Sequence, residues 1–190
     1  MALAEVFADA FCAEELQRRS PSMDNKGWTA HLSSVVAALA ARWSFYGTTK
    51  AMPNEFGRSE YFTLDAVMME RGHPRHDVAG KGNWVTFPMP CVTMEFENEP
   101  IKILYDYWKL LCVRSSLRVL AFIVGSALSD AAPFLKELTA MRLEQQGIDG
   151  EDLLLLGTIG MASNGARFLP LFWRQGAFAE LRSSEQDICE

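Results

Sequence analysis

Three acidic residues, Asp65, Glu95 and Glu97, stand in segments where apolar and polar residues alternate as in β-strands. Glu95 and Glu97 are two positions apart, so both side chains lie on one face of a strand. Mg2+ prefers a few carboxylate oxygens, and Asp65 from a neighbouring strand would complete such a site. A bound ion lowers the pKa of a water molecule and stabilises charge on a phosphoryl group. The spacing therefore predicts a Mg2+ site, in which Mn2+ could substitute, suited to phosphodiester hydrolysis.

Acidic residues at alternate positions are also typical of the solvated face of a half-buried sheet, and that interpretation stays open beside the metal site. No basic residue lies between Glu95 and Glu97. Like charges on one face raise the pKa of one carboxyl group and lower stability. A cost of this kind is easier to understand at a functional site.

The strands that must position these acids are predicted on both sides of a long loop. Residues 61–69 alternate and predict a strand with Asp65 at its centre, after a preceding strand over 43–49. The Gly- and Pro-rich segment 71–90 predicts the loop, and loops of that length are often functional. Residues 91–97 predict the third strand, which ends at Asn98-Glu99-Pro100.

The remaining pattern is helical on both sides of these strands and then returns to strands. Helical spacing of apolar residues predicts four helices, over 3–19, 28–43, 101–112 and 133–146. The third of these carries an apolar stripe expected to pack on the sheet, formed by Ile101, Leu104, Tyr105, Trp108, Leu111 and Cys112. Further strands are predicted over 119–124, 153–160 and 167–173, the last two as a hairpin across Asn164-Gly165.

This order of elements predicts an α/β fold around a mixed sheet. The length of 190 residues suits one domain with a substantial core. We expect the following organisation of a single domain over 1–190: an N-terminal helix in 1–22, an αβββαβ core in 23–124, an added helix and C-terminal hairpin in 125–180, and a flexible tail in 181–190.

The same order of elements, with an Asp on the second strand and an acidic pair at the end of the third, resembles the PD-(D/E)xK nuclease superfamily. The resemblance implies a restriction-endonuclease-like core of helix, three strands, helix and strand. Asp65 matches the single metal-binding Asp of the family motif, and Glu95 matches the acid of the second half-motif. The activity implied is metal-dependent cleavage of DNA, or of RNA.

The chain departs from the family pattern at two positions. Glu97 stands where the family usually has Lys, and Leu64 stands where it has Pro. Some relatives supply the Lys from the following helix, so Lys109 is the expected replacement, with Lys102 as a weaker one. The resemblance then implies Asp65, Glu95 and Glu97 as metal ligands, with Glu97 as ligand or base and Lys109 as charge stabiliser.

The long loop carries two further patterns, both weighed against ordinary polar surface. His73, His76 and Asp77 stand close enough in sequence to suggest zinc ligands, although Pro74 separates the histidines and no further ligand follows. A second set combines basic residues with an aromatic ring, which could contact phosphates and stack on a base. This set comprises Arg71, Arg75, Lys81 and Trp84. Asn98 is expected to cap the helix that follows it, or else to bind substrate.

Composition and charge limit the classes of protein. The formal net charge of -6 argues against tight non-specific binding to nucleic acid, but residues 26–118 hold 11 Lys or Arg against 9 Asp or Glu. Nucleic acid can therefore still dock on the central part of the chain. Four scattered cysteines predict no disulfide scaffold, and the absence of a signal or membrane-spanning segment predicts a cytoplasmic protein with no membrane partner.

Three hypotheses for function follow. The first is a nuclease whose catalytic set is Asp65, Glu95, Glu97 and Lys109, with DNA as the partner. The alternative is a catalytically inactive module of the same fold that serves in binding or assembly. The third is a structural subunit of an oligomer, suggested by the 49% hydrophobic content, and a homodimer is left open.

Overall fold

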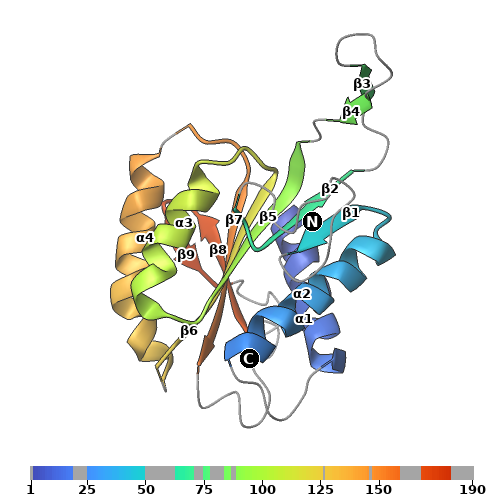
Figure 1. Cartoon of the computed structure of the whole chain (residues 1–190). Helices are drawn as coiled ribbons and strands as arrows, with labels where there is room; N and C mark the ends of the chain where they lie inside the picture. The colour runs from blue at the N-terminus through green and yellow to red at the C-terminus, as the bar shows by residue number, and fades with distance from the viewer. Residues whose placement is uncertain are drawn as a thin grey trace, which may run out of the picture.

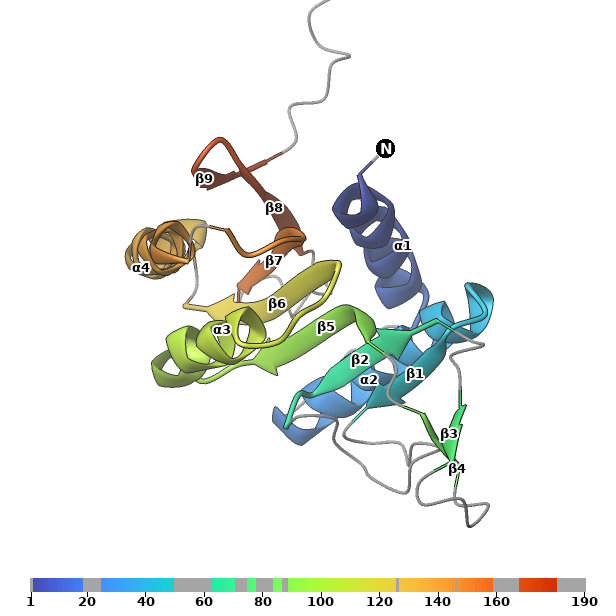
Figure 2. The same cartoon turned by 90° about the horizontal axis from the view of Figure 1, so that it is seen from above.

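A mixed β-sheet runs through the molecule and carries helices on both faces (Figures 1 and 2). The computed structural model describes residues 2–18, 25–49, 63–70, 75–77, 84–86, 89–125, 127–145, 147–158 and 168–180. The helices are α1 (Leu3–Arg18), α2 (Asn25–Arg42), α3 (Ile103–Leu111) and α4 (Ala132–Glu144). The strands are β1 (Tyr46–Thr49), β2 (Ala66–Met69), β3 (Arg75–Asp77), β4 (Trp84–Thr86), β5 (Pro90–Glu97), β6 (Leu117–Val124), β7 (Glu151–Thr158), β8 (Leu169–Arg174) and β9 (Ala177–Ala179).

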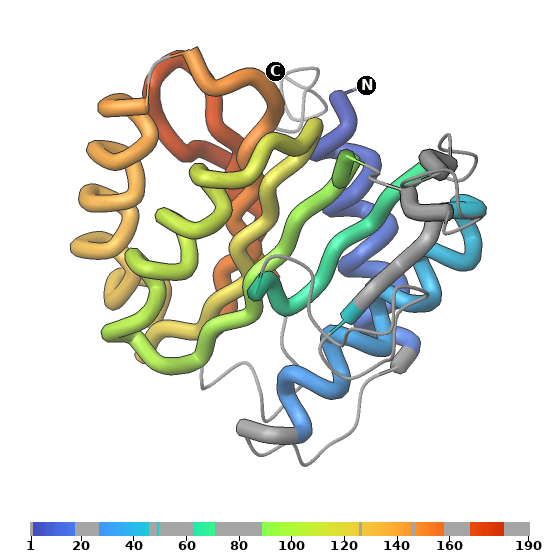
Figure 3. The backbone as a smooth tube through the Cα atoms, turned by 45° about the horizontal axis from the view of Figure 1, so that its top comes forward, coloured from blue at the N-terminus to red at the C-terminus, as the bar shows by residue number. Residues whose placement is uncertain are grey.

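The seven-stranded sheet has the order β1-β2-β5-β6-β7-β8-β9. Strands β1, β2 and β5 are antiparallel neighbours, and β5, β6 and β7 run parallel. The parallel pair β5 and β6 requires a crossover, which α3 supplies (Figure 3). Strands β7, β8 and β9 are again antiparallel. The expected α/β fold around a mixed sheet is confirmed.

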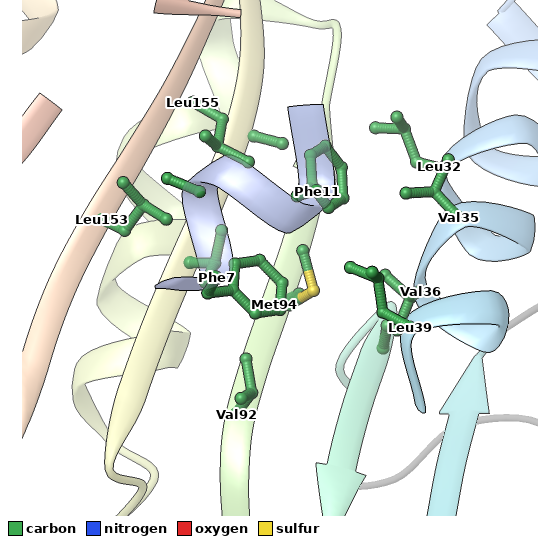
Figure 4. Close-up of a cluster of buried hydrophobic side chains, with 14 of the residues drawn as sticks. Phe7, Phe11, Leu32, Val35, Val36, Leu39, Val92, Met94, Leu153 and Leu155 are labelled. Atoms are coloured by element: carbon green, nitrogen blue, oxygen red, sulfur yellow. The ribbon is translucent and has the colours of Figure 1, made fainter. Parts of the chain in front are cut away.

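One face of the sheet is covered by α1 and α2, whose apolar residues recur at helical spacing. Phe7 and Phe11 of α1 and Leu32 and Leu39 of α2 are fully buried in this layer. They meet residues from alternate positions of the strands, such as Met94 of β5 (Figure 4). The two helices thus cover the face of β5 opposite to the one that carries Glu95 and Glu97.

The other face is covered by α3 and α4, which lie side by side in Figures 1 and 2. Ile103, Tyr107 and Leu110 of α3 are buried here together with Leu138 of α4. The strand below them, β6, is an almost continuous apolar run because both of its faces are covered, as is typical of parallel strands.

The prediction of which side of α3 packs on the sheet was wrong in part: Leu111 is buried and Leu104 packs against the buried cluster, as predicted, but Ile101, Tyr105 and Trp108 do not. Ile101 in the preceding 3-10 turn is 89% exposed, and Tyr105 and Trp108 are 59% and 50% exposed. These three residues, named here the exposed stripe, face solvent, while Ile103 and Tyr107 face the sheet. The cause is that α3 carries apolar residues around most of its circumference, so periodicity alone does not select the buried side.

The predicted C-terminal hairpin is present, and a further strand extends it. Strands β7 and β8 pair with Leu154 opposite Leu171, while the expected turn at Asn164-Gly165 lies outside the described residues. Strand β9 follows through Gln175 and Gly176, which both have positive φ angles of 51° and 84°. Two positive φ angles in a two-residue connection favour a tight hairpin.

Parts of the long loop form a two-stranded antiparallel ladder of β3 and β4, in which His76 pairs with Val85. Both strands lie within the segment 71–90 that was predicted as a loop. The tail expected to be flexible, 181–190, lies outside the described residues. Among the helices of the described chain, none is long and apolar enough to span a bilayer.

A buried ionic network joins the ends of α4, β6 and β7. Arg118 is fully buried and donates through Nε and Nη2 to the two carboxylate oxygens of Asp152, at 2.7 and 3.0 Å. Arg142 donates to the same carboxylate at 2.7 Å. The two guanidinium groups also bind main-chain carbonyl oxygens of Asp149 and Ile148, so they hold the connection between α4 and β7 in place.

Asp152→Ala leaves two buried guanidinium groups without their carboxylate. We expect the free energy of unfolding to fall by about 3 to 5 kcal/mol, because an uncompensated buried charge is costly. Chemical denaturation measures the change. The matched control is Asp149→Ala, because Asp149 is exposed and Arg118 contacts only its main chain. Equal stability of the two variants would contradict the structural importance of this network.

Candidate functional site

Asp65 lies directly before β2 and not in the middle of a strand, so that prediction was wrong. Thr63 has a positive φ angle of 61°, which turns the chain two residues before Asp65 and shortens the strand to Ala66–Met69. Residues 61 and 62 lie outside the described part of the chain. Asp65 is 7% exposed, and its Oδ2 accepts a hydrogen bond of 2.9 Å from the main-chain nitrogen of Phe96. This bond joins Asp65 to β5 between the two glutamates.

Glu95 and Glu97 lie on the face of β5 that α3 covers. Glu95 is 1% exposed and Glu97 is 8% exposed. The alternative interpretation, a solvated face of the sheet, is therefore wrong for these residues. The carboxylate of Glu97 is held at the end of the strand by main-chain N–H groups of Asn98 and Glu99, which donate to its Oε1 at 2.8 and 2.6 Å.

Lys109 reaches back from α3 to the strand, as expected from the sequence. Its Nζ lies 2.7 Å from Oε1 of Glu95 and 2.9 Å from Oδ1 of Asp106. Lys102 instead pairs with Glu99 at 2.8 Å, and both of those side chains are more than half exposed. The structure therefore brings Lys109 to the acidic cluster, whereas the weaker candidate Lys102 pairs with the exposed Glu99.

Asp106 is a member of the cluster that the sequence-based prediction missed. It is 6% exposed and lies three residues before Lys109, so the two side chains share one face of α3. Its carboxyl group also hydrogen-bonds with that of Glu97. The sequence did contain a signal for this contact, because an acid three residues before a lysine on a helix can pair with it.

Burial and like charge hold protons on the glutamates. Desolvation, followed by repulsion from Asp65, raises the pKa of Glu95 to about 9 despite the contact with Lys109. Desolvation and the hydrogen bond with Asp106 raise the pKa of Glu97 to about 7. Burial lowers the pKa of Lys109, but its contacts with Glu95 and Asp106 outweigh burial and raise the pKa above its ordinary value. The amine is therefore a fixed positive charge beside protonatable carboxyl groups.

All of these side chains open into one pocket of about 680 Å3, a size typical of sites for small ligands or parts of larger ones. The pocket lies beside the start of β2 and the C-terminal end of β5, and it is bounded by the first turns of α2 and by one side of α3. It is lined by Thr29, Asp65, Glu95, Phe96, Glu97, Asn98, Glu99, Ile101, Lys102, Tyr105, Asp106 and Lys109.

Asn98 lines this pocket and does not cap the following turn. The N-cap position of the 3-10 turn Pro100–Lys102 is Glu99, without a side-chain capping bond. Of the two roles expected for Asn98, capping is therefore wrong, and contact with a ligand in the pocket stays a prediction.

The donor chemistry of the pocket suits a hard cation, because the described lining residues offer carboxylate oxygens and include no thiol or imidazole. Within the described residues, however, no group of three His, Cys, Asp or Glu side chains is arranged to hold a metal ion. Lys109 instead contacts two of the acids. The cluster thus offers carboxylate oxygens suited to a cation, but the amine of Lys109 already contacts two of the carboxyl groups.

The patterns predicted in the long loop stay predictions. His73, Arg71 and Lys81 lie outside the described residues. The backbone of β3 and β4 is described at the other positions, and it places Trp84 opposite Asp77 in the ladder. The structure therefore leaves the zinc and phosphate-contact hypotheses as they were.

Comparisons with known proteins add no relative to this description. No family model matches the chain, no curated protein matches its sequence, and no solved structure matches it.

Replacing the buried carboxyl group of Glu95 tests its electrostatic state. The folded protein keeps a proton on Glu95 that the unfolded chain releases above its ordinary pKa of 4.5. Stability should therefore fall as the pH rises from about 5 to about 9 in the absence of divalent cations. Glu95→Gln should flatten this fall and be more stable than the wild type by about 1 to 2 kcal/mol at about pH 8.

Denaturation of both proteins across this pH range measures the effect. Glu99→Gln is the control, because the Glu99 side chain is 53% exposed and should leave the slope unchanged. A wild type whose stability has the same pH dependence as Glu95→Gln would contradict a raised pKa at Glu95.

Proposed function

We propose that the chain is a metal-dependent nuclease that hydrolyses phosphodiester bonds in DNA, or in RNA, at the pocket between β5 and α3. One observation carries the proposal. The buried carboxyl groups of Glu95 and Asp106 meet the amine of Lys109 in an open pocket, next to Asp65 and Glu97. Clusters of buried ionisable groups with shifted pKa values are characteristic of functional sites.

The topology supports a restriction-endonuclease-like core. Apart from the separate ladder of β3 and β4, which is inserted between β2 and β5, the chain runs through α2, the antiparallel strands β1, β2 and β5, the crossover helix α3 and the parallel strand β6. This is the order of helix, three strands, helix and strand that the resemblance to PD-(D/E)xK nucleases implies. Asp65 precedes the second of these strands, and Glu95 and Glu97 end the third.

The carboxyl groups of Asp65 and Glu95 would hold Mg2+ or Mn2+, with Glu97 as a further ligand or as base. When bound, such an ion lowers the pKa of a water molecule and neutralises charge on the phosphoryl oxygens. Glu95 and Glu97 would release their protons on binding it, since ligands must be deprotonated. The bound cation would then supply the positive charge that the buried acids of the pocket need in addition to Lys109.

Lys109 and Glu97 have distinct chemical roles in this proposal. The raised pKa of Lys109 keeps its amine charged, so it stabilises negative charge that develops on the phosphoryl group and does not act as a base. Glu97, with a pKa of about 7, can take up a proton from an attacking water near neutral pH. Lys109 thus takes the place of the Lys that the family motif has at position 97.

A second candidate is a catalytically inactive binding or assembly module with the same core. The observation that favours it is the contact of Lys109 with Glu95 and Asp106, which partly neutralises the cluster without any metal. The free thiols of Cys12, Cys91 and Cys112 fit the cytoplasmic setting that we propose for either candidate.

Cleavage of single-stranded and duplex DNA and of RNA, with Mg2+ or Mn2+, tests the enzyme. Asp65→Asn, Glu95→Gln and Lys109→Met should each lower the rate by about a hundredfold or more, because each removes charge from the reacting centre. Lys136→Met is the matched control, since Lys136 is an exposed lysine of α4 and does not belong to the lining of the pocket.

Calorimetric titration with Mg2+ and Mn2+ separates the two candidates. An active nuclease should bind the ion in the wild type and lose that binding in Asp65→Asn. If neither ion binds and no substrate is cut, the enzyme hypothesis is wrong and the inactive module is favoured. Full activity in Lys109→Met would exclude the role proposed for that amine.

A further inference from the structure

The exposed stripe of Ile101, Tyr105 and Trp108 is an apolar surface directly beside the acidic pocket. Ile101 and Tyr105 belong to the lining of that pocket, so the stripe is continuous with it. All three side chains are at least half exposed, although they stand on a segment whose other side is well buried. Large apolar side chains gathered at the mouth of a polar pocket mark a binding surface.

The two rings of the stripe are arranged as a platform. Tyr105 and Trp108 stack with ring centroids 5.8 Å apart and an angle of 28° between their planes. The amine of Lys109 lies 5.5 Å from the centre of the Tyr105 ring while also contacting Glu95. One cation therefore connects the platform to the acidic cluster, so a ligand on the rings is adjacent to the candidate reacting groups.

The charge of the pocket determines which kinds of contact the two rings must make with a ligand. Among the described residues, five acids line the pocket against two lysines, so this part of the lining does not attract a polyanion. A nucleic acid held there needs contacts that do not depend on charge, in addition to divalent cations. Stacking on aromatic rings is such a contact, is tolerant of sequence, and strengthens binding by about tenfold or more per base.

We propose that Tyr105 and Trp108 stack with unpaired bases of a single-stranded nucleic acid and so hold the strand at the pocket. The inference rests on the proposed nuclease function and assigns its substrate class. In a duplex the base faces are covered by their neighbours, so exposed rings on a helix surface can receive only unstacked bases.

The size of the exposed stripe argues against a second copy of this chain as its occupant. An aromatic side chain buries about 150 to 250 Å2 when fully covered. Three side chains that are already partly buried therefore supply well under the roughly 800 Å2 per partner of a standard interface. A single strand needs only its bases covered, which matches a surface of this size.

Binding of a labelled oligonucleotide of about ten nucleotides tests the inference by fluorescence anisotropy. Ca2+ replaces Mg2+ so that a divalent ion is present, and gels of the same samples report any cleavage. The wild type should bind the single strand at least about tenfold more tightly than the matching duplex. Tyr105→Ala and Trp108→Ala should each weaken single-strand binding by about tenfold, and the double variant by about a hundredfold.

Two controls separate stacking from loss of structure. Trp108→Phe keeps an aromatic face and should retain binding within about threefold of the wild type. Leu143→Ala removes an exposed apolar side chain of α4, on the same face of the sheet but outside the pocket lining, and should change nothing. Circular dichroism confirms that each variant is folded.

The outcomes separate this inference from the proposed function. Ring-dependent strand binding without cleavage in Mg2+ or Mn2+ would support the platform and contradict the nuclease. Cleavage with unchanged strand binding in the double variant would support the nuclease and overturn the platform. Light scattering completes the test, because a wild-type dimer that Trp108→Ala converts to monomer would assign the stripe to self-association and overturn the inference.

Discussion

The contact between Lys109 and Glu95 is the interaction around which the candidate site is organised. Burying Glu95 on a strand covered by α3 disfavours its charged form, and a positive charge beside it offsets part of that cost. Helix α3 supplies that charge through Lys109. It lies over Glu95 because it is the crossover between the parallel strands β5 and β6. The buried side of α3 packs in the core, and an adjacent side of the same helix places Lys109 and Asp106 over the acids of β5. Fold and site are therefore built by the same element.

Much of the fold is predictable from the sequence because periodicity reports burial directly. Phe7 and Phe11 recur at helical spacing, and the continuous apolar run of β6 indicates a strand covered on both faces. The position of Asp65 was wrong and β9 was missed, both for local reasons. The positive φ angle of Thr63 moves Asp65 out of the strand, and β9 is a strand of three residues behind a tight turn. Backbone conformations of this kind cannot be predicted from the spacing of the apolar residues.

The candidate site was predicted in part. Residue type and spacing place Glu95 and Glu97 on one face of a strand, but alternation is the same whether that face meets water or a helix, so their burial could not be predicted. Lys109 was expected from the resemblance, while Asp106 was missed because no pattern in strands points to an acid on the covering helix. The apolar residues of α3 surround the helix, which explains why the exposed stripe was assigned to the core.

The amine of Lys109 has a consequence for how any cation enters the pocket. A metal ion that approaches Glu95 does not fill an unoccupied position but takes part in an exchange with a tethered ammonium group. Because the tether keeps that competitor at high effective concentration, dilution does not remove it. If Mg2+ binds as proposed, its net affinity is the difference between its own contact with Glu95 and the contact of Lys109 that it replaces. Under the proposed function, the protein itself would therefore carry a reversible competitor of its cation.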